Sequence, residues 1–513
     1  MIKNIFLVLI LLLSFANAKN TLNFATSKNV GPLNPHLYSP NEMWAQDMLY
    51  ESLVEYNEDG KIVSKLAVSW RIADEGKTYV FTLREGVKFS DGVSFDAKAV
   101  KLNFDAILAN RDRHKWLELA NILKDCEIID DKTIALHLQN AYEPTLKELS
   151  LVRPFRFISP LAMKDANSTK DGIIAPVGTG AWKLASTKLG INDIFVKNEN
   201  YWGQKPKFDE IVAKVIPDPN TKVVALQTGE VDLIYGNGQI SFDMINELKK
   251  SYEVKVSEPM NTLVLALNSN KSPTNDLAVR EALNLAVDKN AIANSIFFGV
   301  QKSADALFYS KLPYCDIELK PYKFDKKAAN EILQKGGWEM GKDGIRYKDG
   351  KELKIELVYI GTNATFKSIG EILQAELKQI GVNLQLKADE STIFYKKQRS
   401  GDFGMIFNST WGVPYDPVMF LASMRLPSHA DYQAQLGLKD KAWIDESISE
   451  ILKTFDEGKK SSLIKNVLTR LHDEAVYLPI SHESMIWISN DKVGGARTSI
   501  FQNHYPFNEI YPK

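Results

Sequence analysis

Residues 351–388 read KELKIELVYIGTNATFKSIGEILQAELKQIGVNLQLKA, and they hold a helical pattern between two strand patterns. Apolar side chains alternate along the outer parts at Leu353, Ile355, Leu357 and Tyr359, and again at Val382, Leu384 and Leu386. The middle part has helical spacing at Ile369, Ile372, Leu373, Leu377 and Ile380. Gly381 stands where that helix should end. A strand–helix–strand unit crosses over right-handed and leaves its strands parallel, so the pattern predicts an α/β fold.

The same mixture of patterns continues along the chain. Residues 263–267 are typical of a buried strand, and Asp276 can cap the helix that follows. Near the C-terminus, residues 475–480 and 485–489 have strand patterns, and we expect a polar bend between them at 481–483. These segments favour α/β architecture throughout.

A length of 513 residues is too great for one hydrophobic core, so we expect two lobes. The predicted first lobe comprises residues 19–261 and 484–513 and includes an inserted subdomain. The predicted second lobe comprises residues 262–483. The chain would cross between the lobes near 259–264 and near 481–484, and these crossings would act as a hinge.

Composition and charge are those of an ordinary soluble protein. Apolar residues make up 44% of the chain and charged residues 25%. The 63 Lys and Arg residues nearly balance the 64 Asp and Glu residues. No net field therefore favours nucleic acid or an anionic membrane as a partner.

The first 18 residues have the pattern of a signal peptide. Lys3 provides the positive charge, residues 5–15 form an apolar run, and residues 16–18 (Ala-Asn-Ala) fit a cleavage site. The run is too short to span a bilayer comfortably. No Cys follows the cleavage site, so we expect a protein that is exported to the periplasm without a lipid anchor and that begins near Lys19.

Two cysteines occur in the chain, Cys126 and Cys315. Export would permit a disulfide. The predicted domain division, however, places them in different lobes, where a bridge would lock the hinge. We therefore expect two separate, partly buried thiols.

A loop rich in Pro and Gly presents aromatic side chains. It spans residues 407–417 (FNSTWGVPYDP), with Trp411 and Tyr415, and the segment that follows ends in His429. Such a loop can present rings and one nitrogen ligand, but it cannot by itself form a metal cage or a catalytic triad. The sequence also contains no Gly-x-Ser-x-Gly, Walker or His-Glu-x-x-His motif. We expect a binding protein that closes over a small ligand, and no enzyme.

The histidines are too scattered to form a metal cage. They are His36, His114, His137, His429, His472, His482 and His504. No two stand at spacing i, i+2 or i, i+4, and there is no Cys-x-x-Cys. A transition-metal ion usually takes about four to six donors. We therefore expect any bound metal ion to arrive inside a small organic chelator, with its carboxylates paired to arginine.

Several strings resemble one family. They are LAVSW (66–70), YVFTLREGVKFSDG (79–92), PVGTGAW (176–182), NENYWG (198–203) and DLAVREAL (276–283). Together they resemble the large solute-binding proteins of ABC importers, peptide/nickel class (family 5, cluster C), over essentially the whole mature chain. The resemblance implies a type II periplasmic binding protein fold, with two α/β lobes, an interlobe ligand cleft and no catalysis. It also implies delivery to a membrane permease with its ATPase, usually by a monomer.

Further strings are similar to the nickel-binding branch of this class. They are NVGPLNPHLY (29–38), RDRHKWLELA (111–120), RPFRF (153–157) and the segment 411–429. The implied ligand is nickel(II) within an organic chelator, for which L-histidine is chemically suitable because it offers imidazole, amine and carboxylate donors. Two copies would leave one coordination position for a protein imidazole.

The resemblance also implies most residues of the site. His429 would be the direct metal ligand, and the chelator's carboxylates would bind Arg153 first and Arg113 second. His482 departs from the family pattern, which has a tyrosine there, and is either a second imidazole ligand or a solvated histidine. The walls would be Tyr38, Met43, Trp116, Trp411 and Tyr415. We expect His36 and His114 to be hydrogen-bonded structural residues, and we assign no role to His137, His472 or His504.

An alternative within the same family is an oligopeptide or haem carrier. Peptide binders of the class usually hold the peptide ammonium with an acidic residue of the loop, and here that region offers Asp416 alone. Peptide binding is therefore disfavoured, but it stays an alternative.

Overall fold

The computed structural model describes residues 19–38, 42–165, 168–259, 261–412, 416–501 and 503–513. The predicted signal peptide of residues 1–18 and the predicted wall residue Tyr415 lie outside these ranges. Among the described residues, no helix combines the length and apolar character needed to cross a bilayer.

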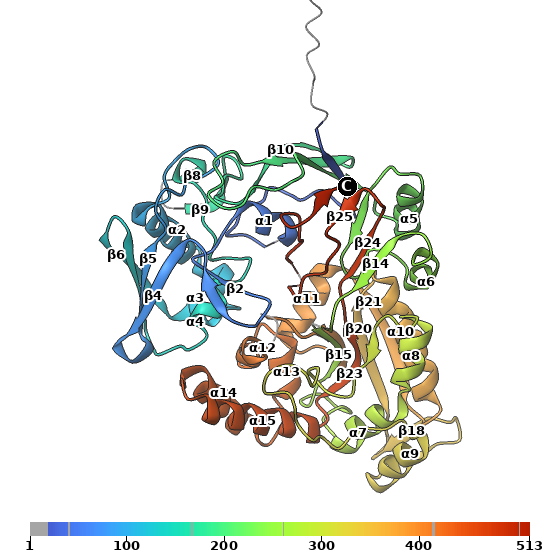
Figure 1. Cartoon of the computed structure of the whole chain (residues 1–513). Coiled ribbons are helices and arrows are strands. Elements are labelled where there is room, and N and C mark those ends of the chain that lie inside the picture. The colour runs from blue at the N-terminus through green and yellow to red at the C-terminus, as the bar shows by residue number, and fades with distance from the viewer. Residues whose placement is uncertain (1–18, 39–41, 166–167, 260, 413–415, 502) are drawn as a thin grey trace, which may run out of the picture.

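A seven-stranded sheet forms the body of the first lobe (Figure 1). Its spatial order is β10 (Trp182–Lys188), β11 (Asn192–Lys197), β12 (Glu210–Val215), β1 (Thr21–Thr26), β13 (Leu233–Tyr235), β24 (Ile486–Ser489) and β14 (Glu253–Val256). Helices of this lobe are α1 (Met43–Leu49), α2 (Ala97–Ala109), η2 (Arg111–His114), α3 (Glu118–Ile122), α4 (Thr145–Leu149), α5 (Pro219–Gln227) and α6 (Ile245–Leu248). The C-terminal strand β24 is inserted between β13 and β14, so this sheet needs both ends of the chain.

A separate four-stranded antiparallel sheet lies within the sequence range of the predicted first lobe, whose inserted subdomain stays a prediction. Its order is β4 (Ala67–Ala73), β5 (Thr78–Leu83), β7 (Thr133–Leu138) and β6 (Leu123–Asp130). Short hairpins are β2 (Val54–Tyr56) with β3 (Ile62–Ser64), β8 (Met163–Asp165) with β9 (Ser168–Ile173), and β25 (Val493–Gly494) with β26 (Tyr511–Pro512). Helix α3 directly precedes β6, and α4 follows β7.

The second lobe is built on a six-stranded mixed sheet. Its order is β16 (Lys302–Ser303), β23 (Tyr477–Glu483), β15 (Asn261–Leu267), β22 (Met405–Ser409), β20 (Lys354–Ile360) and β21 (Asn383–Asp389). A small sheet of β17 (Glu339–Met340), β18 (Arg346–Lys348) and β19 (Lys351–Glu352) adjoins it. Its helices are α7 (Leu277–Ala286), α8 (Lys289–Ser295), α9 (Lys326–Lys335), α10 (Ala364–Lys378), α11 (Ser391–Ser400), α12 (Val418–Ser423), α13 (Ala430–Gln435), α14 (Lys441–Lys453) and α15 (Glu457–Asp473). In Figure 1, α8 and α10 lie along one face of the sheet and α11 to α13 along the other.

The strand–helix–strand prediction is confirmed. β20 and β21 are parallel, in a register that begins with Lys354 opposite Asn383, and α10 connects them. Ile369, Leu373 and Leu377 are fully buried on the helix face that covers the sheet. Gly381 adopts φ +82°, a left-handed conformation that glycine reaches without a Cβ penalty. The predicted cap at Asp276 is also confirmed, because its carboxylate accepts the N–H of Ala278 at 3.0 Å.

The expected polar bend at residues 481–483 is wrong. Strand β23 continues through Glu483, and His482 pairs with Thr262 on one side and with Lys302 on the other. Polar residues sit in this strand because sheet pairing satisfies their backbone groups. The chain passes from the seven-stranded to the six-stranded sheet between Val256 and Asn261, and it returns between Glu483 and Ile486. The exact lobe boundaries and the hinge stay predictions.

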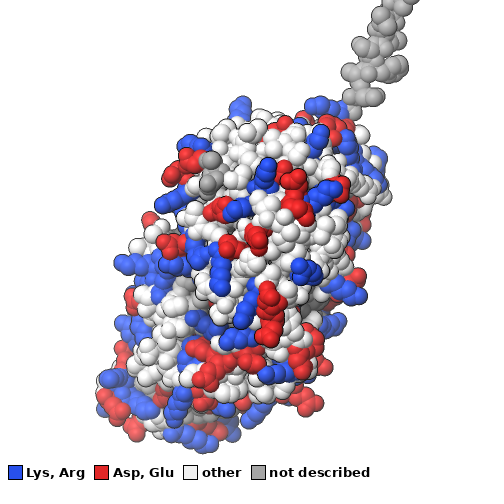
Figure 2. Space-filling model, turned by 90° about the vertical axis from the view of Figure 1, so that its left-hand side faces the viewer, with Lys and Arg blue, Asp and Glu red and all other residues white. Residues whose placement is uncertain are grey.

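Basic and acidic side chains are interspersed over the face that Figure 2 shows, as the near-balance of charges in the sequence predicts. Both cysteines are buried and free, Cys126 on β6 and Cys315 in a loop of the second lobe. Burial raises the pKa of each thiol to about 12, so both are protonated at neutral pH.

Candidate functional site

Four rings form a continuous row that crosses from the first lobe to the second. The centroids of Tyr38 and Trp116 are 5.6 Å apart, and those of Trp116 and Trp411 are 5.5 Å apart, both in edge-to-face geometry. His429 stacks on Trp411 with centroids 5.9 Å apart and planes 19° from parallel. We call these four residues, with Arg153 and His114, the ring cluster. Aromatic walls of this kind exclude water and offer flat faces to a planar ligand.

Arg153 lies over one end of the row, with its guanidinium carbon 4.5 Å from the centroid of the Tyr38 ring. The side chain is half-buried, and it forms no ion pair with any other residue that the structure describes. Burial lowers the pKa of Arg153 to about 10, against the weaker opposing effects of Tyr38 and Glu42, so the group is charged at neutral pH. A buried guanidinium without a carboxylate partner is costly unless a ligand supplies the anion.

His429 occupies the other end of the row. It stands at the N-terminus of α13, yet its ring makes no capping hydrogen bond there. Its Nε2 atom is buried and has no hydrogen-bond partner within the described part of the chain. Burial lowers the pKa of His429 to about 4, although the backbone carbonyl of Trp116 opposes the shift. The neutral imidazole therefore has a nitrogen available for a ligand.

His114 belongs to the ring cluster, although the sequence suggested only a structural role. Its Nδ1 atom accepts a short hydrogen bond from the Tyr38 hydroxyl, and its buried Nε2 atom has no partner among the described residues. Burial lowers the pKa of His114 to about 3, so the ring is neutral and can accept that proton. His36, in contrast, uses both ring nitrogens, on Thr169 at 2.8 Å and on the Arg156 carbonyl at 3.1 Å. The sequence held one sign of this placement, because His114 stands between Arg113 and Trp116, two residues that are predicted to belong to the site.

The other predicted site residues lie outside the ring cluster. Arg113 is exposed on η2, and Met43 is the half-buried first residue of α1. His482 is buried in β23, with its Nδ1 atom 3.1 Å from the Thr262 hydroxyl and its ring 5.1 Å from that of Tyr309. Their roles stay predictions.

A cavity of about 350 Å³ adjoins the ring cluster. Leu151 and Val152, next to Arg153, line it together with Gly412, next to Trp411. The remaining wall carries many charged residues, mostly from α1, β2 and the C-terminal segment. His504, for which no role is predicted from the sequence, also lines this wall, with its Nδ1 atom 2.7 Å from Asp47. The C-terminal segment reaches this wall only through tertiary contacts, which periodicity does not reveal.

Within the described ranges, no group of three or more His, Cys, Asp or Glu side chains is arranged to hold a metal ion. Among the described residues, the cluster instead offers two imidazole nitrogens without a hydrogen-bond partner, on His429 and His114, together with one guanidinium and three aromatic rings. This donor set suits an anionic, partly planar guest that brings most of its own metal donors.

Comparison with known proteins identifies the class. The model of the bacterial extracellular solute-binding proteins, family 5, matches residues 61–432. The match covers most of the chain, which therefore belongs to this family, and the predicted two-lobed α/β fold class is confirmed.

Individual relatives lie within the same family. The chain is 49% identical over 502 residues to the nickel-binding periplasmic protein of Escherichia coli K12. This match covers 97% of this chain and 95% of the relative. The crystal structure of NikA from Brucella suis in complex with Fe(III)-EDTA superimposes with a TM-score of 0.93 at 50% identity, over 96% of this chain and 100% of that one. Haem-binding protein A of Haemophilus influenzae is 26% identical over 497 residues, 91% of this chain and 88% of the relative.

Proposed function

We propose that this protein is the extracytoplasmic solute-binding component of an ABC importer and captures nickel(II) as a chelate with a small organic molecule. The observation that carries the proposal is the ring cluster, in which the Nε2 atom of His429 has no hydrogen-bond partner and the guanidinium of Arg153 no ion-pair partner among the residues that the structure describes. The name of the E. coli relative and its 49% identity support nickel as the cargo.

The chelator is proposed to carry carboxylates, with L-histidine as a suitable example. Arg153 would bind a carboxylate through its planar fork, while His429 would complete the coordination of the metal. Tyr38, Trp116 and Trp411 would enclose the organic part. The Brucella relative was solved with an iron chelate of an aminopolycarboxylate, and at 50% identity this supports a site for carboxylate-bearing metal complexes.

Peptide binding is less well supported, because the acidic residue of the loop is already engaged. Asp416 is 6% exposed, its Oδ1 atom accepts the N–H of Val418 at 2.7 Å, and its Oδ2 atom pairs with Lys147. A peptide ammonium would have to displace this internal cation. Peptides and haem stay the alternative ligands, and a binding measurement must distinguish them from the nickel chelate.

The remaining expectations concern the setting of the protein. We propose that residues 1–18 direct export to the periplasm and that the mature protein acts as a monomer without catalytic activity. Closure of the lobes on the chelate would create the surface that the permease recognises, and the associated ATPase would drive import. Ligand shifts this equilibrium only by its difference in affinity for the two forms.

Isothermal titration calorimetry tests the cargo. Purified mature protein, freed of metal, is titrated with nickel alone, L-histidine alone, nickel with L-histidine, a dipeptide, or haem. We expect tight binding only for the nickel chelate, lost in His429→Ala and retained in His137→Ala, a control at a half-buried position on β7. Equally tight binding of bare nickel with or without histidine would contradict the chelate, and tight binding of dipeptide or haem alone would favour the alternative.

A further inference from the structure

An ion pair joins the stretch that carries Trp116 to the stretch that carries His429. The Nη2 atom of Arg425, just after α12, lies 3.3 Å from Oε2 of Glu118, the first residue of α3. The two side chains are 21% and 20% exposed, so water and salt screen the pair only in part. Within the described ranges Glu118 is the one ion-pair partner of Arg425, so removing either member leaves the other charge uncompensated.

A short, internally bonded stretch of residues 425–429 connects the ion pair to His429, and the structure describes every residue of it. The N–H of Leu426 donates to the Ser423 carbonyl at 3.0 Å. The N–H of His429 donates to the Leu426 carbonyl, also at 3.0 Å. Because these successive turns leave little slack, a displacement of Arg425 should also displace His429.

The other member of the ion pair is equally close to the ring cluster. Glu118 follows Trp116 by two residues. Burial lowers the pKa of His429, and the backbone carbonyl of Trp116, which accepts from the His429 ring, opposes this shift. The Nε2 atom of His429 has no hydrogen-bond partner among the described residues, so Nδ1 is the nitrogen that faces this carbonyl. The two stretches therefore meet at two points, one at the carbonyl and one at the ion pair.

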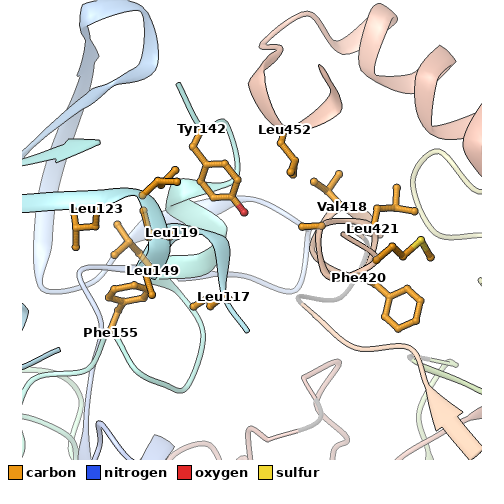
Figure 3. Packing of buried hydrophobic residues seen from close by; sticks show 14 of the residues in the cluster. Leu117, Leu119, Leu123, Tyr142, Leu149, Phe155, Val418, Phe420, Leu421 and Leu452 are labelled. Carbon is orange, nitrogen blue, oxygen red and sulfur yellow. The ribbon is translucent and has the colours of Figure 1, made fainter. Parts of the chain in front are cut away.

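An apolar seam lies beside the ion pair (Figure 3). One cluster of buried side chains unites a group around α3 and α4 with a group around α12, namely Leu117, Leu119, Tyr142 and Leu149 with Val418, Phe420, Leu421 and Leu452. Figure 3 shows the two groups side by side. Burial raises the pKa of Tyr142, and the charges of Glu118 and Arg425 also act on it, so the seam adjoins the pair. An apolar neighbour of this kind strengthens an ion pair.

We propose that the ion pair of Glu118 with Arg425 positions His429 for the ligand. It holds residues 425–429 against residues 116–118, which keeps Nδ1 of the imidazole on the Trp116 carbonyl and leaves the lone pair of Nε2 for the metal ion. Both charged side chains act through His429, so they are positioning residues. The effect on nickel chelate affinity rests on the proposed function, whereas the effect on the His429 ring does not.

The variants are Glu118→Gln, Arg425→Met and the double variant, all in the mature protein. Gln keeps the shape of Glu118, and Met keeps most of the apolar stem of Arg425. The matched control is Lys197→Gln, because Lys197 is also 21% exposed and pairs with Asp209 at 2.6 Å, within the seven-stranded sheet and its β12 edge. Circular dichroism verifies that each variant is folded.

Nitrogen NMR of the ligand-free protein measures the position of the ring proton. The histidine rings are labelled with the heavy nitrogen isotope, and the signals of His429 are identified by their absence in His429→Ala. We expect the proton on Nδ1 in wild type and in the control, because the Trp116 carbonyl accepts it. In both single variants a substantial share of the rings should carry it on Nε2 instead. An unchanged ring in both single variants would overturn the proposal.

Calorimetric titration with nickel and L-histidine measures the effect on binding. We expect each single variant to bind about tenfold to a hundredfold more weakly, the double variant to be no weaker than these, and the control to match wild type. In the His429→Ala background, Glu118→Gln should cause no further loss, because the pair acts through the imidazole. The same loss with and without His429 would overturn the proposal. A wild type that binds no nickel chelate would refute the proposed function alone, since the NMR measurement uses no ligand.

Discussion

Replacing Arg153 by Met should weaken ligand binding while stabilising the ligand-free protein. The guanidinium is half-buried over the Tyr38 ring and has no carboxylate partner among the described residues. Met keeps most of the apolar stem and the contact with the ring, but it removes the charge. When only a ligand compensates a buried charge, removing that charge should raise the stability of the ligand-free protein and weaken ligand binding.

The two magnitudes follow from the structure. Burial lowers the pKa of Arg153 from 12.5 to about 10, and each pKa unit corresponds to about 1.4 kcal/mol. Burying the charge of Arg153 therefore destabilises the ligand-free protein by up to about 3 kcal/mol. Partial solvent access reduces this cost, and the variant also loses the cation–π contact with Tyr38. The free energy of unfolding of Arg153→Met should therefore exceed that of wild type by about 1–2 kcal/mol. A bidentate, charge-assisted contact with a carboxylate stabilises the complex by more than this, so affinity should fall at least about a hundredfold.

Urea unfolding of the ligand-free protein and calorimetric titration with nickel and L-histidine measure the two effects. The control is Arg71→Met, an exposed position on β4, which should change neither quantity. Arg153→Lys should retain the charge but lose the planar fork, and so bind with intermediate affinity. The reasoning is refuted if Arg153→Met destabilises the ligand-free protein and binds the chelate as tightly as wild type.

Three further predictions concern other parts of the molecule. The variant His429→Ala should bind the nickel chelate about a hundredfold or more weakly in calorimetry. Its melting temperature should stay within a few degrees of wild type, because the Nε2 atom has no hydrogen-bond partner among the described residues and only the contacts with Trp116 and Trp411 are lost. Burial opposes the charge on His504, but hydrogen bonds with Asp47 and Glu509 outweigh it and raise the pKa of His504 to about 10. The stability from this group is therefore complete below about pH 6.5 and lost as the pH rises toward about 10, so wild type should lose about 2 kcal/mol more than His504→Gln in urea unfolding over this range. A parallel decline in both proteins would contradict that assignment. Finally, a Cβ at Gly180 would stand 2.3 Å from the backbone oxygen of Met48. Gly180→Ala should therefore lower the free energy of unfolding by about 3 kcal/mol in urea. The control Gly190→Ala should lower it by less, because a Cβ there meets no atom within 4 Å.

The sequence was most informative where structure is local. The unit β20–α10–β21 and the cap at Asp276 depend on residue spacing and on contacts within a few residues, so periodicity and capping chemistry predicted them. The strand through His482 was mistaken for a bend, because polar side chains in a central strand resemble a turn unless their cross-strand partners are known.

The candidate site was only partly predictable for the same reason. Tyr38, Trp116, Arg153, Trp411 and His429 come from segments far apart in the chain, and the resemblance to a family, not periodicity, selected them. The structure shows that these residues contact one another in a row. It also adds His114, and it places the C-terminal segment at the neighbouring cavity. Those contacts depend on packing between distant elements, which no local pattern encodes.

The position of β24 has a consequence for how the protein acquires its fold. Because this strand completes the seven-stranded sheet between β13 and β14, that sheet stays open until residues near the C-terminus are available. Strands β10, β11, β12 and β13 can pair with one another and with β1 before β24 is available, whereas β14 must wait for β24. Closing contacts at such sequence separation is intrinsically slow. The topology thus makes the docking of β14 onto this sheet a late step that depends on the C-terminal part of the chain.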